Sequence, residues 1–307
     1  MEPIETHIEY IVDDPRFLKE RPFAVNISPA SKIDGTLHTV NWVPQRTVIH
    51  DIRLLKGVTL DQYGFQNFQY VFTPLPKEQL THSDVVRYQI ETEQFLKQAL
   101  NVERVICFDC RFRKNGPPIN VGEVIDVNNP LHFDLPPRGA HSKSCRLVLQ
   151  SHIEKITDDI TFEGGPFLIK KIINTIGEPQ LLHRKYRYRI VNTWRPLVER
   201  LDDNPLAFCD FRTVDKDDLL ASDQIYAQLR TELYYLKYNK NQKWYWLSHQ
   251  TPEEVMVMVM YDTKAGSGAR FCPHVSFENP QADSQAPPRE SVETRSIVLS
   301  LNSADDC

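Results

Sequence analysis

Hydrophobic and polar positions follow a strand-like pattern over most of the second half of the chain. Apolar side chains alternate with polar ones or run together in short segments, and polar or proline-containing turns separate them. These segments are 185–197, 205–214, 232–240, 243–249, 254–263, 269–277 and 294–302, with earlier ones at 46–55, 65–73 and 104–113. Short strands at near-regular spacing favour a double-sheet jelly roll or barrel.

Two segments have helical periodicity instead. Residues 81–102 repeat apolar side chains about every 3.6 positions, and Ser83 is a candidate N-cap. The segment "GPFLIKKIINTIG" at 165–177 predicts a second helix that ends near Gly177. We therefore expect an α+β, mainly β fold in which helices flank a jelly-roll core.

Composition and charge limit the classes of molecule that this chain is expected to bind. The chain has 307 residues with 41% hydrophobic content, which is enough for a substantial core. The net charge of -5 and the absence of a long Lys/Arg stripe argue against nucleic acid as a partner. The acidic N-terminus lacks secretory-signal features, and no run reaches the length of a membrane span. We expect a cytoplasmic protein without a membrane partner, and the sequence leaves the oligomeric state open.

The sequence lacks the motifs of several common enzyme and nucleotide-binding classes. Neither GxGxxG nor a P-loop occurs, and the absence of GxSxG disfavours a hydrolase. The six cysteines are expected to be free thiols. Cys107 and Cys110 form a CxxC on a strand pattern, but no second pair completes a zinc site, so a plain strand is favoured.

A late histidine followed by two arginines is the most informative constellation. Arg289 and Arg295 introduce the closing strand, and a buried guanidinium needs an anion. With His274 on a jelly roll, this indicates the two-histidine, one-carboxylate site of non-haem Fe(II) oxygenases, whose bidentate 2-oxo acid has a far carboxylate that an arginine can bind. The alternative is a surface strand in which Glu290 and Glu293 pair with the arginines.

The motifs "IVNTWRPL", "PLAFCDFRTV", "ARFCPHVSFENP" and "PPRESVETR", in this order, resemble the fungal secondary-metabolite hydroxylase/desaturase family named after AsaB. That family includes gibberellin desaturase-type enzymes and is similar to bacterial CmcJ-type proteins. Residues 50–73 and 86–113 resemble its N-terminal half, so the likeness covers nearly the whole chain.

The resemblance implies a double-stranded β-helix (jelly-roll, cupin-like) core and Fe(II), 2-oxoglutarate and O2 as cofactors. One oxygenase domain would span 1–307, with an N-terminal α/β elaboration over 1–130 and the core over 131–302. The expected substrate is a small molecule, an amino acid or a natural-product intermediate. The expected outcome is hydroxylation, desaturation or oxidative ring closure.

The resemblance also assigns site residues. His274 matches the distal iron ligand, and the expected contacts to cosubstrate or substrate are Arg289, Ser291, Arg295, Asn192 and Arg195. Which arginine binds which carboxylate stays open. For Asn192 and Arg195, a polar network that ties strands together is an equal alternative.

The remaining iron ligands depart from the family's His-x-Asp pattern. Thr157 stands where the histidine is expected, two residues before Asp159. Skipping residues 143–158 brings His141 into that position. The rival interpretation is a genuine insertion in which His152 and Glu154 are ligands, and we favour His141 and Asp159.

We hypothesise that residues 143–158 are translated intron. Codons for 142–144 can contain a donor-like GTAAGT, codons for 157–158 an acceptor-like CAG, and excision keeps the frame. If the insertion is genuine and disrupts the site, the alternative function is a catalytically inactive jelly roll that binds a small carboxylate or a partner protein.

Overall fold

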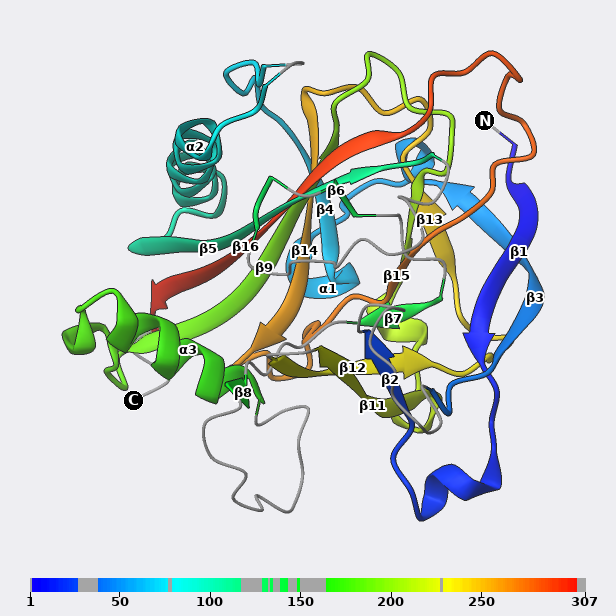
Figure 1. Ribbon diagram of the computed structural model, residues 1–307, viewed down its shortest axis with the longest axis horizontal. Helices are drawn as coiled ribbons and strands as arrows, with labels where there is room; N and C mark the ends of the chain where they lie inside the picture. Colours follow the sequence, from blue (N-terminus) through cyan, green and yellow to red (C-terminus); the bar gives the residue numbers. More distant parts are fainter. Residues whose placement is uncertain are drawn as a thin grey trace.

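The computed structural model describes residues 2–26, 38–76, 79–116, 129–131, 133–134, 139–142, 148–149, 164–226 and 229–302. The candidate ligands Asp159, His152 and Glu154 therefore lie outside the described residues. Within the described ranges the chain is mainly β, with few helices (Figure 1). The predicted α+β, mainly β class is confirmed.

Two sheets contain the strands. The first runs in the order β1 (Ile4–Ile11), β3 (Trp42–Asp51), β13 (Trp244–Trp246), β10 (Leu206–Cys209), β15 (His274–Ser276), β7 (His141–Ser142), β12 (Leu229–Leu236), β11 (Leu219–Tyr226) and β2 (Phe23–Asn26), and β8 (Val148–Leu149) also pairs with β12. The second runs in the order β4 (Phe65–Gln69), β14 (Glu254–Asp262), β9 (Tyr186–Pro196), β16 (Glu290–Leu301), β5 (Arg104–Lys114) and β6 (Phe133–Asp134).

The helices are short except for α2. They are α1 (Leu60–Tyr63), α2 (His82–Leu100) and α3 (Gly164–Thr175), with the 3-10 turns η1 (Pro15–Leu18), η2 (Ile52–Leu54), η3 (Pro179–Leu181), η4 (Phe211–Thr213) and η5 (Lys216–Asp218). Both predicted helices are present. The N-cap prediction was wrong, because Thr81, not Ser83, caps α2 in a capping box with Asp84.

Strand alternation gives the second sheet two apolar faces. One face packs against α2, which lies outside the sheet in Figure 1, and buries Val191, Val292 and Val298. The opposite face buries Trp194 and Ile297 in a core shared with Phe208 of the first sheet. Side chains on the same face as Trp194 and Ile297 therefore point into the space between the sheets.

The first sheet curls back on itself. Gly139, just before β7, forms a bridge with Glu9 of β1, and the Ala140 amide donates to the Glu9 carbonyl at 2.8 Å. The strands from β1 through β3, β13, β10 and β15 to β7 thus close a ring. An apolar core that includes Trp244, Trp246 and Phe277 lines this ring.

Each of the ten strand segments expected from the sequence contains a strand, but the pattern missed β1, β2, β11 and the two-residue strands β6, β7 and β8. Cys107 and Cys110 lie on β5 as free thiols, as their alternation predicts.

Candidate active site

Two buried histidines lie side by side on neighbouring strands. His141 of β7 is the direct pairing partner of His274 of β15, and their ring centroids are 4.7 Å apart. The Nδ1 atom of His141 contacts the Gly139 carbonyl at 2.7 Å, and that of His274 contacts the Cys272 carbonyl at 3.0 Å. Because a carbonyl only accepts, each Nδ1 carries the proton and each Nε2 keeps the lone pair that a metal needs.

The protonation state of His274 suits a ligand. Burial lowers the pKa of this imidazole, and the nearby Glu293 carboxylate offsets part of that effect. The ring is therefore neutral at physiological pH, which is the form that binds metal ions.

Asp159, the carboxylate expected to complete the ligand set, lies outside the described residues. Among the residues that are described, no group of three histidine, cysteine or carboxylate side chains is arranged to hold a metal ion. The structure thus brings His141 and His274 together, and the assignment of Asp159 stays a prediction.

Arg289 immediately precedes β16 and is only 1% exposed. Its Nη1 donates to the Asn204 carbonyl and to Ser276 Oγ, both at 2.9 Å, and its Nε donates to Ser291 Oγ at 3.1 Å. These acceptors are neutral, and within the described residues no carboxylate forms an ion pair with this guanidinium. Burial accordingly lowers the pKa of Arg289. A buried guanidinium whose side-chain hydrogen bonds go only to neutral acceptors is a candidate binding position for an anionic ligand.

Ser276 connects this cation to the histidines. It lies two residues after His274 on the same face of β15, and two strand residues span about 7 Å. Arg289 is thus placed about the length of a small dicarboxylate away from the His274 ring.

Arg295 differs from Arg289 because it has acidic partners. Its Nη1 lies 3.1 Å from Asp109 Oδ2, and its Nε lies 3.7 Å from Glu293 Oε1. The alternative of a paired, charged strand therefore describes Arg295, whereas Arg289 is buried without such a pair among the described residues. Of the two arginines, Arg289 is the stronger candidate for binding a cosubstrate carboxylate.

Asn192 and Arg195 lie on opposite faces of β9. Asn192 faces the space between the sheets and donates from Nδ2 to Glu293 Oε1 at 2.9 Å. Arg195 faces α2, where its Nε donates to Tyr88 Oη at 2.9 Å and its guanidinium lies 4.8 Å from the Phe72 ring centroid. Because Arg195 faces away from the space between the sheets, it fits the alternative of a polar contact that ties elements together, and the proposed cosubstrate site keeps only Asn192 of the two.

The sequence reasoning missed Trp194, which shares the inward face of β9 with Asn192. The Arg289 guanidinium lies 5.1 Å from its ring centroid. The buried Trp194 Nε1 has no hydrogen-bond acceptor among the described residues, and the buried Asn192 Oδ1 has no donor there. Strand alternation in "VNTWRP" was the signal that places Trp194 beside Asn192.

A cavity of about 380 Å³ lies behind this site and is lined by Asp203, Asn204, Glu278, Asn279, Ala282, Asp283, Ser284 and Ala286. Its carboxylates disfavour an anionic cosubstrate, so the cavity is not the candidate site.

Comparison with known proteins defines the class. Residues 8–299 match the family described as "YDMC: Oxidoreductase/YMDC permease-like domain". The "Fe(II)/2-oxoglutarate-dependent dioxygenase nvfI" of Aspergillus novofumigatus is 26% identical over 96% of each chain, and the "Hydroxylase/desaturase efuI" of Hormonema carpetanum is 38% identical over 83% of each. A solved variant of the iron and alpha-ketoglutarate-dependent endoperoxidase NvfI superposes with a TM-score of 0.77 at 25% identity, covering 98% of this chain and 99% of that one.

The mainly β architecture is that of this endoperoxidase structure. The chain belongs to the fungal AsaB-like hydroxylase/desaturase family of Fe(II)/2-oxoglutarate-dependent oxygenases, which confirms the family expected from its motifs. None of the helices in the described ranges has both the length and the apolarity to span a bilayer.

Proposed function

We propose that this chain is an Fe(II)/2-oxoglutarate-dependent oxidoreductase of secondary-metabolite biosynthesis, built on a double-stranded β-helix core. It hydroxylates, desaturates or oxidatively cyclises a small-molecule substrate. The observation that carries the proposal is the pair of buried, Nδ1-anchored histidines together with the buried Arg289, which lacks an anion among the described residues.

The donor set fits a ferrous ion. His141 and His274 supply two neutral imidazole nitrogens from adjacent strands, and Asp159 is the proposed carboxylate. When bound, iron with 2-oxoglutarate and O2 supplies the oxidising power to remove hydrogen from an unactivated carbon. The backbone carbonyls of Gly139 and Cys272 orient the rings toward the metal.

Arg289 and Ser291 are the proposed carboxylate-binding residues. A guanidinium binds a carboxylate through two parallel hydrogen bonds, and burial strengthens that attraction. Arg295 and Asn192 lie on the same inward face and are proposed to contact cosubstrate or substrate. The apolar core around Trp194, Phe208 and Met258 keeps water away from the reacting carbon.

The proposed carboxylate ligand depends on residues 143–158. We favour the explanation that these residues are translated intron, since their removal restores a His-x-Asp motif with His141. Sequencing the transcript tests this explanation directly, and a message that retains the segment in every copy would contradict it.

The function is tested by anaerobic Fe(II) and 2-oxoglutarate titration, followed by measurement of succinate after O2 is admitted. We expect metal-dependent 2-oxoglutarate binding that His274→Ala abolishes and Arg289→Leu weakens, with slow succinate formation even without substrate. A protein that binds 2-oxoglutarate equally well without metal and forms no succinate would instead be the catalytically inactive carboxylate-binding protein.

A further inference from the structure

The turn formed by Asp203 and Asn204, between β9 and β10, contacts Arg289 at both its backbone and its side chain. The Arg289 amide donates to Asp203 Oδ2 at 2.8 Å, and its Nη1 donates to the Asn204 carbonyl at 2.9 Å. Neighbouring residues of one turn therefore determine where the guanidinium lies.

The direction of the Asn204 carbonyl depends on an unusual backbone conformation. Asn204 has φ of 44°, in the left-handed region that asparagine tolerates and β-branched residues strongly disfavour. Its carbonyl accepts from Arg289 Nη1 and from Ser276 Oγ, the latter at 3.0 Å. Because the Ser276 proton goes to this carbonyl, the serine oxygen can itself accept from Arg289. Rotating the Asn204 carbonyl would disturb both contacts of Nη1.

Asp203 fixes the turn to its surroundings. Its Oδ2 also accepts from Asn115 Nδ2 at 2.7 Å, and its Oδ1 accepts from Asn204 Nδ2 at 2.6 Å. One carboxylate thus links the end of β5, the start of β16 and the side chain of Asn204.

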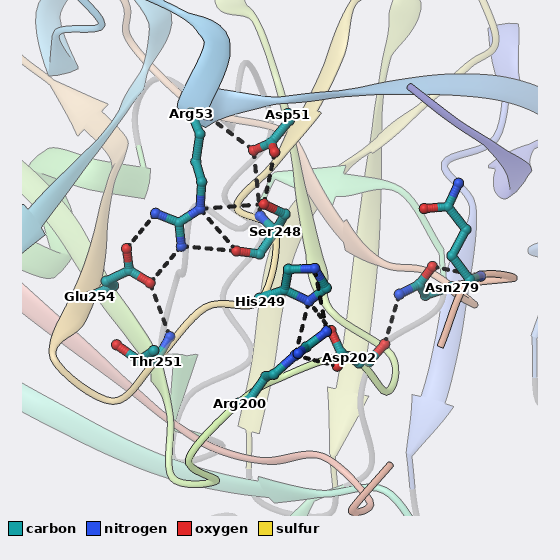
Figure 2. Close-up of polar contacts among 10 residues, drawn as sticks. Asp51, Arg53, Arg200, Asp202, Ser248, His249, Thr251, Glu254 and Asn279 are labelled. Atoms are coloured by element: carbon teal, nitrogen blue, oxygen red, sulfur yellow. Dashed lines mark hydrogen bonds and ion pairs between the residues drawn. The ribbon is translucent and has the colours of Figure 1, made fainter. Parts of the chain in front are cut away.

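The residue before the turn is also held from several sides, as Figure 2 shows. The Asp202 carboxylate contacts His249 Nδ1 at 2.6 Å and Arg200 Nε at 2.8 Å, and its carbonyl accepts from Asn279 Nδ2 at 3.1 Å. The turn is therefore a rigid support rather than a loop that adapts to Arg289.

We propose that Asn204 is a positioning residue for the cosubstrate: its left-handed backbone aims the Arg289 guanidinium at the distal carboxylate of 2-oxoglutarate without touching that carboxylate. This inference rests on the proposed function, in which Arg289 binds the carboxylate. Since the Arg289 guanidinium donates only to neutral oxygens among the described residues, its orientation depends on the direction of those few hydrogen bonds.

A graded series at position 204 tests the inference. Asn204→Gly keeps the left-handed backbone, Asn204→Ala disfavours it, and Asn204→Val disfavours it most. The dissociation constants of 2-oxoglutarate and oxalate are measured by anaerobic calorimetry on the Mn(II)-loaded enzyme. Oxalate chelates the metal but has no distal carboxylate, so it reports the metal end of the site alone.

We expect the 2-oxoglutarate dissociation constant to rise in the order Gly, Ala, Val, reaching about tenfold for the valine variant. Oxalate affinity should stay at the wild-type value throughout. If the valine variant does not fold, the comparison of alanine with glycine retains the test. Equal weakening of both ligands would show a merely structural role and overturn the inference, as would a flat series.

Arg289→Leu separates this inference from the proposed function. If Arg289→Leu weakens 2-oxoglutarate but the Asn204 series is flat, only the positioning role fails. If Arg289→Leu leaves 2-oxoglutarate binding unchanged, the proposed carboxylate site itself is wrong.

Discussion

At the scale of single residues, the orientation of the proposed iron ligand His141 depends on Gly139. The Gly139 carbonyl anchors His141 Nδ1, and a Cβ atom at Gly139 would lie 2.2 Å from the Trp42 ring. Any larger residue must displace either the tryptophan or the carbonyl. Glycine at this position therefore supports the orientation of the proposed ligand His141.

We expect Gly139→Ala to weaken Fe(II) binding by about 10- to 100-fold, the usual cost of disturbing an outer-shell contact. Anaerobic Fe(II) titration measures the effect. In the double variant Gly139→Ala/Trp42→Ala the clash is removed, and affinity should largely return. Wild-type affinity in the single variant would contradict this assignment.

A site residue could be predicted from the sequence only where a motif indicated both its chemical role and its position on a strand. His274 and Arg289 were expected from their order and from the cost of burying a cation, and the structure places both beside Ser276. Asn192 and Arg195 were both candidates for contacts to cosubstrate or substrate, but three residues along a strand reverse the face, so they lie on opposite sides of β9. Asn204 could not be predicted, because its left-handed backbone arises from contacts with distant residues.

At the scale of elements, Arg195 connects β9 to α2 rather than to the site. Its guanidinium packs on Phe72 and donates to Tyr88 Oη. We expect Arg195→Met to lower the free energy of unfolding by about 1–3 kcal/mol through the lost hydrogen bonds. Urea unfolding measures this change. Calorimetry should show unchanged 2-oxoglutarate affinity, and a clear loss of that affinity would return Arg195 to the cosubstrate site.

An ion pair between Arg53 and Glu254 joins the two sheets. Arg53, just after β3, donates from both terminal nitrogens to the Glu254 carboxylate at the start of β14, each at 2.7 Å (Figure 2). Burial raises the pKa of Glu254, but the hydrogen bonds from Arg53, the Thr251 amide and Gln69, together with the charge of Arg53, outweigh it, so the net pKa lies below the usual value. The contact therefore stabilises the fold above the ordinary carboxyl pKa and is lost as the pH falls through the lowered value.

We expect Glu254→Gln to cost about 1 kcal/mol of unfolding free energy at pH 7, because the pair is partly exposed. The difference from the wild type should shrink as the pH is lowered below about 4.3. Asp14→Asn removes the exposed pair with Arg16 and serves as the control, with a much smaller effect. A difference that grows on acidification would contradict the linkage.

Element prediction succeeded for the long helix α2 and failed for short or interrupted strands, although it also missed β1, in which burial alternates. The apolar stripe of α2 gave its extent, but the cap was placed at Ser83, whereas "THSD" carries the capping box in which Thr81 is the cap. β11 reads "LLASDQIY", whose buried Ser222 and Asp223 break the apolar alternation. Its pairing with β12 and β2 is set by tertiary contacts, not by its own pattern.

At the scale of the whole molecule, the residues of the proposed site come from both sheets. The first sheet carries His141 and His274, and the strand β16 of the second sheet begins directly after Arg289. A ligand that bridges the two stabilises their packing. Saturating Mn(II) with 2-oxoglutarate at about 100 times its dissociation constant should add about 2.7 kcal/mol to the unfolding free energy. Scanning calorimetry tests this, and Arg289→Leu should show a smaller increase at the same ligand concentrations.

The proposed ligand Asp159 gives a prediction about the segment 143–158. We expect a variant that lacks this segment and has Asn in place of Ser142 to bind Fe(II) at least about tenfold more tightly than the full chain. Anaerobic titration of both proteins decides the matter. Equal, tight binding would favour a genuine insertion with its own ligands.

The pairing of His141 with His274 also constrains when the site can form. The Ala140 amide next to His141 bonds to β1, near the start of the chain, whereas His274 and Arg289 are close to its end. The imidazole pair therefore forms only once β7 and β15, which are far apart in the sequence, have paired. A fragment that stops before β15 lacks His274 and would not complete the proposed iron site.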